Sequence, residues 1–235
     1  MKGFLGLFKL RLIDPYEVFY DVPSNTFYPI VSKAGCTSVK KFLIEKYHPN
    51  FQIGFPEIHK VDPAELTDGK LERQMFFRKS AYIAFARGKQ MKLIIRNPLH
   101  RFFSCYIDVR KGKNTLYEHP SGLDWLVKSD PNLTLQKFLD RVCATPDHLA
   151  DRHFRSQSFF FPQAIKRGLH SFEISDIENT RLNNESDESQ VGEVEKHNEN
   201  KEKPSEQQVE FLKHHRGFQK RYKRDIELFK SIVEN

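Results

Sequence analysis

Residues 26–48 contain an apolar segment, a tight polar turn and an amphipathic segment in direct succession. The segment 26–32, TFYPIVS, has the aromatic and β-branched residues that are typical of a buried strand. From Ser38 onward apolar residues recur at helical spacing, at Val39, Phe42, Leu43 and Tyr47. A strand, a glycine turn and a helix in this order favour a phosphate site, because the first N–H groups of the helix point back toward the turn.

The turn itself, residues 33–38, reads Lys-Ala-Gly-Cys-Thr-Ser. Gly35 lets backbone N–H groups face an anion without side-chain obstruction, and Thr37 and Ser38 add hydroxyl donors. Lys33 precedes the glycine, whereas the lysine of a Walker A loop, GxxxxGK[ST], follows it. The chain also lacks an apolar strand that ends in an aspartate able to hold Mg²⁺. The sequence therefore does not favour an NTPase.

A second apolar segment, KLIIRN at 92–97, has the length of a strand and ends in Arg96 and Asn97. Proline follows at position 98, where the first turn of a helix tolerates it, and the pattern predicts a helix that ends at Gly112. Arg96 and Ser104 are suited to bind a terminal phosphate, through a guanidinium fork and a hydroxyl. Taken alone, this segment is more consistent with an Arg96 that caps a carboxylate and a Ser104 that is an ordinary serine on a helix surface.

The two segments together resemble the two signatures of sulfotransferases that use 3′-phosphoadenosine 5′-phosphosulfate (PAPS). IVSKAGCTSVKKFL is similar to the first signature, Pro-Lys-x-Gly-Cys/Thr-Thr/Ser between a strand and a helix, with Ser32 in place of the customary proline. The carbohydrate (Golgi-type, family 2) branch is the most similar. The second signature, V-x-R-[DN]-P-x-x-R-x-x-S-x-Y, is matched by IIRNPLHRFFSCY through Arg96, Asn97, Pro98, Arg101, Ser104 and Tyr106.

Weaker matches extend toward the C-terminus. DRHFRSQSFFF at 151–161 resembles the Asp-x-His-x-x-Pro-Gln segment of this branch, with Ser156 at the position of the proline. FEISDIEN resembles a strand of the family that ends in Glu/Asp-Leu, and KRYKRDIELF resembles its terminal Tyr-x-x-Asp-x-x-Leu-Phe. The resemblance thus extends from about residue 26 to residue 230.

The resemblance implies a fold, a donor and a set of ligands. The expected fold is α/β, a P-loop-like three-layer arrangement with a central, mainly parallel sheet flanked by helices, and the alternation of predicted strands and helices agrees with it. The expected donor is PAPS, bound without a metal. Lys33 is expected beside the bond that breaks, and Arg96 and Ser104 at the 3′-phosphate. The cradle of the 5′-phosphosulfate is expected to comprise Lys33, Ala34, Gly35, Cys36, Thr37 and Ser38.

The general base is predicted less directly. His153 is the leading candidate, because a neutral imidazole is suited to proton removal near pH 7, although His153 could equally be structural or contact the substrate. Glu57 and His59, in FPEIHK, are the alternatives. Asp151 could orient His153 only in a loop or strand, because side chains two residues apart on a helix diverge.

Other segments complete the predicted organisation. A helix is expected at 134–143, a strand at 171–177, and a closing helix from Ser205 that bends or breaks at Gly217. The segment 76–88 is ambiguous between helix and strand. Residues 179–206 are polar and lack aromatic residues, which indicates a solvated loop or flexible insertion. The length of 235 residues fits a single domain over 1–235.

Composition constrains partners and compartment. The net charge of +7 favours an anionic partner, but basic and acidic residues are interspersed and no nucleic-acid-binding motif is present, so nucleic acid is not expected. Three cysteines without CxxC spacing argue against a zinc site or disulfide framework and favour a reducing compartment. No segment reaches the roughly 20 apolar residues that span a bilayer. A cytoplasmic protein is expected, or else a luminal piece of a membrane-anchored Golgi-type enzyme.

The sequence therefore predicts sulfuryl transfer from PAPS to a hydroxyl-bearing acceptor, a carbohydrate or glycan by the branch that it resembles. The alternative is a non-catalytic module on the same fold that binds an anionic glycan or a nucleotide. The presence of Lys33, Arg96 and Ser104 argues against that alternative. The identity of the acceptor and the oligomeric state do not follow from the sequence.

Overall fold

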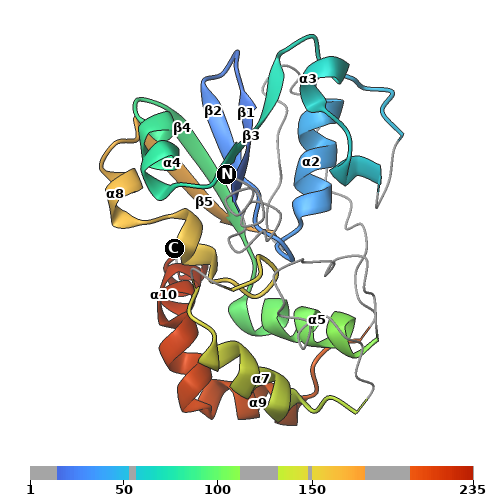
Figure 1. The fold of residues 1–235 in the computed structure, drawn as a ribbon, viewed down its shortest axis with the longest axis vertical. Coiled ribbons are helices and arrows are strands. Elements are labelled where there is room, and N and C mark those ends of the chain that lie inside the picture. Colours follow the sequence, from blue (N-terminus) through green and yellow to red (C-terminus); the bar gives the residue numbers. More distant parts are fainter. Residues whose placement is uncertain (1–14, 53–56, 112–131, 148–149, 178–201, 235) are drawn as a thin grey trace, which may run out of the picture. The chain divides into compact units, whose positions relative to one another are not determined.

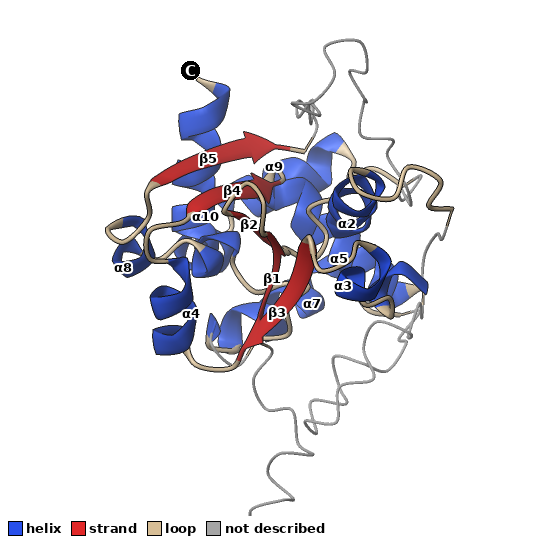
Figure 2. Ribbon diagram, turned by 90° about the horizontal axis from the view of Figure 1, so that it is seen from above, coloured by secondary structure: helices blue, strands red, loops and turns tan. Residues whose placement is uncertain are grey.

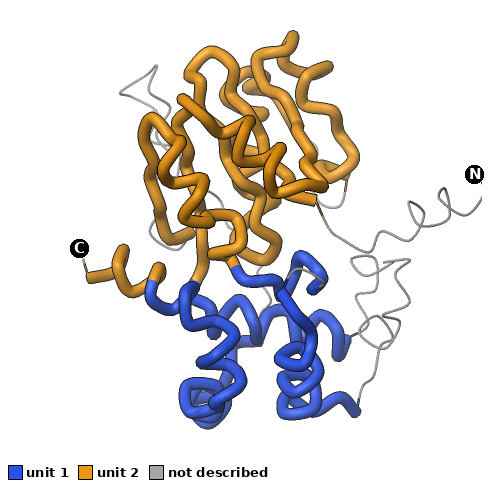
Figure 3. Tube along the Cα trace, turned by 60° about the vertical axis from the view of Figure 1, so that its left-hand side comes forward, with its two compact units in different colours: residues 1–14, 97–156, 200–227 blue, residues 15–96, 157–199, 228–235 orange. Residues whose placement is uncertain are grey.

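A computed structural model describes residues 15–52, 57–111, 132–147, 150–177 and 202–234. They fall into two compact units (Figure 3). The sheet unit comprises Pro15–Arg96, Gln157–Glu199 and Leu228–Asn235, and the helical unit comprises Asn97–Ser156 and Asn200–Glu227 with the first residues of the chain. The single domain over 1–235 stays a prediction, and most of the predicted polar insertion lies outside the described residues.

The sheet unit is built on five strands in the order β3-β1-β2-β4-β5 (Figure 1). β2 pairs with β4, and β4 with β5, in parallel, whereas β1 is antiparallel to both β2 and β3. The predicted α/β class is confirmed, and the parallel part of the sheet is limited to β2, β4 and β5. The strands are β1 (Tyr16–Asp21), β2 (Thr26–Pro29), β3 (Leu71–Phe76), β4 (Gln90–Ile95) and β5 (Ser171–Asp176).

Helices cover both faces of this sheet (Figure 2). Because successive side chains of a strand point to opposite faces, Phe27 of β2 joins the cluster that contains Tyr82, and Tyr28 joins the cluster that contains Leu43. The unit therefore has three layers. One face carries α2 (Cys36–Glu45), the 3₁₀ turn η1 (Glu57–His59) and α3 (Pro63–Leu66), and the other carries α4 (Lys79–Ala86) and α8 (Gln163–Lys166).

The helical unit buries an aromatic core between its four main helices, with Phe102, Phe138, Leu212 and Phe218 among its members. The predicted helix starts are confirmed: the Asn97 side chain caps α5 by accepting from the Leu99 N–H at 3.0 Å, with Pro98 in the first turn. The helices are α5 (Pro98–Arg110), α7 (Leu135–Ala144), α9 (Glu206–His214) and α10 (Arg216–Val233), the last of which continues into the sheet unit.

The predicted break at Gly217 is displaced. Ser205 does cap α9, in a capping box with Gln208, but the helix ends where His215 adopts an extended backbone, and Gly217 lies inside α10. A Cβ on Gly217 would lie 3.1 Å from the His215 ring and 3.3 Å from the Cys143 Sγ. This glycine therefore allows close packing beside the break.

The helix that follows the predicted phosphate turn is anchored at its far end by Asp21. This fully buried carboxylate accepts a hydrogen bond from the Tyr47 hydroxyl at 2.7 Å and pairs with the Lys46 Nζ at 2.9 Å, just after α2. Burial by itself raises the pKa of Asp21, but the bonds from Tyr47 and Lys46 and the Lys46 charge together lower it below its usual value.

We expect this anchor to make stability pH-dependent in the acid range. A carboxyl group whose pKa is lowered in the folded state stabilises the folded protein at pH values above its unfolded pKa, which is about 3.9. This stability is lost as pH falls through the folded pKa. Urea unfolding from pH 7 to pH 3 should show a smaller acid loss in Asp21→Asn than in the wild type, and Tyr47→Phe should be intermediate. Parallel curves for wild type and Asp21→Asn would contradict this assignment.

Candidate functional site

The turn between β2 and α2 holds its backbone in an uncommon conformation. Lys33 has φ of +64° and Gly35 has φ of +76°, and the Ala34 N–H donates to the Val31 carbonyl at 3.2 Å. For a non-glycine residue the left-handed region costs on the order of 1–2 kcal/mol. Strain at a single lysine next to a glycine is typical of a loop that is shaped for a ligand.

The start of α2 follows directly on this turn. The first N–H groups of a helix have no acceptor within it, and together with the helix dipole they attract anions. Cys36, Thr37 and Ser38 occupy these positions, Gly35 provides no side-chain cap, and the first turn contains no acidic residue. The predicted cradle thus coincides with a helix start, and Lys33 lies on its N-terminal side.

The position of Gly35 is fixed by contact with Ile177. A Cβ on Gly35 would lie 2.5 Å from the Ile177 Cδ1, closer than atoms of a folded protein can approach. The Ile177 N–H in turn donates to the carbonyl of Ile95, the last residue of β4, at 2.9 Å. Arg96 follows directly. The two predicted phosphate segments therefore lie at the same edge of the sheet, the carboxyl end of its parallel strands, where ligands of open α/β sheets bind.

The backbone of Arg96 is held by the side chain of Gln157. The Arg96 N–H donates to the Gln157 Oε1 at 2.9 Å, and the Gln157 Nε2 donates to the Arg96 carbonyl at 2.8 Å. Gln157 is fully buried, and both the oxygen and the nitrogen of its side-chain amide are hydrogen-bonded. The amide thus pairs with the backbone of Arg96 as a neighbouring strand would. The sequence indicated Gln157 only as part of a family-like segment, and its contact with Arg96 could not be read from spacing.

The two alternative bases differ in their surroundings. Glu57 is exposed in η1. His59 lies with its Nε2 3.5 Å from the Thr37 Oγ1 and its Nδ1 3.3 Å from the Lys40 Nζ. Lys40 is buried and pairs with Glu17 at 2.7 Å. An ammonium only donates, so the Nδ1 of His59 accepts and a neutral ring carries its proton on the Nε2. His59 is therefore suited to orient the Thr37 hydroxyl, and unsuited to take a proton from a substrate.

Ser104 and His153 belong to the helical unit. Ser104 lies within α5 and is 9% exposed. His153 is buried in a turn rather than a helix, and its Nδ1 lies 2.5 Å from the Asp151 Oδ1, which also accepts from the His153 backbone N–H at 2.8 Å. The loop geometry that such a pair requires is thus present. With its Nδ1 proton directed to Asp151, the Nε2 is the ring atom able to accept a proton.

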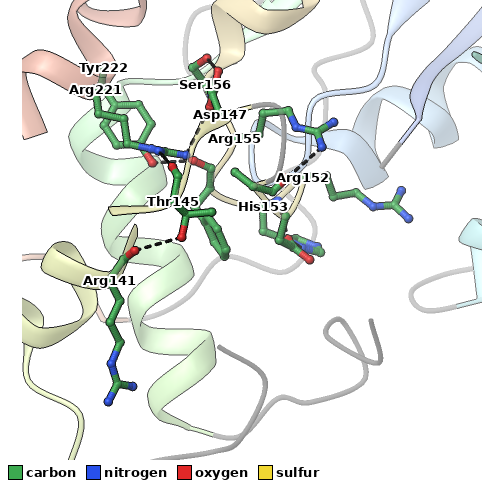
Figure 4. Close-up of polar contacts among 12 residues, drawn as sticks. Arg141, Thr145, Asp147, Arg152, His153, Arg155, Ser156, Arg221 and Tyr222 are labelled. Carbon is green, nitrogen blue, oxygen red and sulfur yellow. Dashed lines mark hydrogen bonds and ion pairs between the residues drawn. The ribbon is translucent and has the colours of Figure 1, made fainter. Parts of the chain in front are cut away.

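Ser156, which stands where the resembled family has proline, has a specific role in this turn. Its backbone N–H donates to the Asp147 Oδ1 at 2.9 Å, and its hydroxyl donates to the Asp147 Oδ2. The Arg221 Nη2 approaches the same carboxylate at 3.3 Å (Figure 4). A proline could not donate the backbone bond. The departure from the family pattern is therefore compensated by a local network that holds the end of the turn.

These features define an α/β protein that has a glycine turn before a helix start and an arginine after the neighbouring strand, both on one edge of its sheet. A family model described as the sulfotransferase family (family 2) matches residues 17–230. The chain belongs to this family, as the sequence motifs predicted. Searches of curated proteins and of solved structures found no match to the chain.

Two further searches covered only the described residues. No helix there combines the length and the apolar character that a membrane span requires. Within the same residues, no group of three or more His, Cys, Asp or Glu side chains has a geometry suited to a metal ion.

We expect Gly35→Ala to destabilise the protein and to disrupt the turn. The added Cβ meets Ile177, and overpacking of this kind costs roughly 1–3 kcal/mol beyond the cost of the left-handed backbone. Gly69→Ala is a matched control, because Gly69 has φ of +74° but no atom within 4 Å of its added Cβ. Urea unfolding should therefore show a clearly larger loss for Gly35→Ala. Equal losses would mean that only the positive φ at position 35, and not the contact with Ile177, requires a glycine there.

Proposed function

We propose that the protein transfers the sulfuryl group of PAPS to a hydroxyl of a carbohydrate or glycan. Membership of the family supports sulfuryl transfer in general. The observation that carries the choice of donor is the turn itself: Lys33 precedes Gly35 at a helix start whose first turn contains no acidic residue, and Arg96 directly follows the neighbouring strand. The P-loop-like character of the fold is part of this proposal and is supported by the same turn.

The residues of the turn fit a phosphosulfate. Gly35 has a positive φ and no Cβ that could screen its backbone N–H from a ligand. PAPS, when bound, supplies the sulfuryl group and a phosphate leaving group. In sulfuryl transfer, as in phosphoryl transfer, negative charge grows on the bridging oxygen. The Lys33 ammonium and the N–H groups of residues 35–38 would stabilise that charge, and Arg96 and Ser104 would bind the 3′-phosphate that distinguishes PAPS from ATP.

His153 is the proposed general base. Its pairing with Asp151 orients the ring, and in this proposal the Nε2 would take the acceptor proton. His59 is engaged on both ring nitrogens and would act on the cradle through Thr37. The three cysteines are free thiols, which supports a reducing compartment, and we propose the cytoplasm.

The proposed function is tested by incubation with ³⁵S-labelled PAPS and a panel of glycans, phenols, lipids and peptides, followed by mass spectrometry of the labelled product. We expect labelled glycan. Transfer to phenols or lipids alone would contradict the acceptor class. Tight binding of PAPS without transfer to any acceptor would favour the non-catalytic module instead.

Lys33→Ala should lower kcat by on the order of 10²–10³, and it should weaken binding of the bisphosphate product much less, because the lysine acts mainly on charge that develops in the transition state. Lys41→Ala is the control, since Lys41 lies on α2, the helix that follows the turn, and pairs with Glu45 at 3.6 Å. Steady-state kinetics and calorimetry on both variants separate the two effects. An unchanged kcat in Lys33→Ala would remove the lysine from the mechanism.

His153→Ala should lower kcat by roughly 10²–10⁴ and leave bisphosphate binding intact. His214→Ala is a matched control, because His214 also contacts a carboxylate, Glu210, at 2.6 Å, but its side chain is 77% exposed. Glu57→Gln should have little effect, and His59→Ala should mainly weaken donor binding. A larger loss of kcat in Glu57→Gln or His59→Ala than in His153→Ala would show that the base is misassigned.

A further inference from the structure

Four consecutive backbone carbonyls of the turn that contains His153 accept hydrogen bonds from buried side chains of the helical unit. The Arg101 Nη2 donates to the Arg152 carbonyl at 3.0 Å, and its Nη1 donates to the Arg155 carbonyl at 2.7 Å. The Cys105 thiol donates to the His153 carbonyl at 2.8 Å, and the Tyr222 hydroxyl donates to the Phe154 carbonyl at 2.6 Å. Every peptide group from 152 to 155 is thus held from outside the turn.

The three donors are placed to resist movement. Arg101, Cys105 and Tyr222 are each at most 2% exposed, so water does not compete for these carbonyls. The guanidinium bridges the two ends of the turn with a rigid fork, which a lysine could not reproduce. Burial raises the pKa of Tyr222, so its hydroxyl keeps its proton and remains a donor.

Two of these residues lie in family motifs but have no role in the proposed mechanism. Arg101 lies in the second signature, between Arg96 and Ser104, and Tyr222 begins the C-terminal Tyr-x-x-Asp-x-x-Leu-Phe pattern. The catalytic assignment uses neither side chain. The backbone carbonyls that accept from these two side chains belong to residues 152, 154 and 155, on either side of His153.

We propose that Arg101, Cys105 and Tyr222 are positioning residues that hold the His153 imidazole in the orientation required of a base. This inference rests on the proposed function for the role of His153. Cys105 follows Ser104 directly on α5, so one rigid helix carries both a proposed ligand of the 3′-phosphate and two of the donors that hold the base. A displacement of the turn by about 1 Å would be enough to lower the rate by up to roughly 10²-fold.

Tyr222→Phe tests the proposal with Tyr106→Phe as its matched control. Tyr106 is also a buried tyrosine of the helical unit, and its hydroxyl donates to the Leu133 carbonyl at 2.9 Å, away from the His153 turn. Both variants should lose similar thermal stability. Only Tyr222→Phe should lower kcat, by roughly 10-fold or more, with little change in the KM for PAPS. In the His153→Ala background, Tyr222→Phe should cause no further loss of kcat.

A second readout does not depend on activity. The ¹⁵N signals of the His153 imidazole, assigned by their loss in His153→Ala, should shift in Tyr222→Phe and in Arg101→Lys but not in Tyr106→Phe. Amide exchange of residues 152–155 should accelerate in the same two variants. If wild-type protein shows no transfer from PAPS, the proposed function fails, and these measurements still test the positioning.

Two results would overturn the positioning role. One is that Tyr222→Phe and Tyr106→Phe give the same His153 ¹⁵N signals, the same amide exchange and the same kcat. Tyr222 would then be an ordinary core residue, and the sulfotransferase assignment would stand. The other is an undiminished effect of Tyr222→Phe in the His153→Ala background, which would mean that Tyr222 acts independently of His153.

Discussion

The contact between Gly35 and Ile177 is the constraint on which the proposed donor site depends. It leaves no room for a side chain at position 35, and it joins the turn before α2 to the end of β5. Because the Ile177 N–H also bonds to the Ile95 carbonyl, the same contact sets the turn beside the residue that precedes Arg96. The two segments that are proposed to bind phosphate, although far apart in the sequence, thus share one edge of the sheet.

The side chains that are proposed to bind the donor or to react are placed by other residues. Gln157 pairs with both backbone groups of Arg96, and His59 connects the Thr37 hydroxyl to the buried Lys40–Glu17 pair. In the helical unit the turn with His153 is held through its carbonyls. In each unit, contacts thus fix the backbone that carries a proposed functional side chain. Preorganised sites avoid reorganisation during the reaction in this way.

Much of this arrangement could be predicted from local sequence. The turn at 33–38, the helix that follows it and the start of α5 at Pro98 depend on nearby residues, and the structure has them where the patterns indicated. The antiparallel hairpin of β1 and β2 was missed, because the expectation of a mainly parallel sheet came from the alternation of predicted elements. The contacts from Gln157 to Arg96 and from Tyr222 to Phe154 join residues 61 and 68 positions apart, and single-sequence periodicity contains no signal for such pairs.

The most direct test of the central claim, that the turn at Lys33 and the strand end at Arg96 form a PAPS site, is calorimetric titration with adenosine 3′,5′-bisphosphate in the presence of EDTA. We expect the bisphosphate to bind without a metal and clearly more tightly than ATP or adenosine 5′-phosphate, because only the bisphosphate presents a 3′-phosphate to Arg96 and Ser104. Arg96→Ala should remove most of this preference. Binding of ATP as tight as that of the bisphosphate would contradict the account.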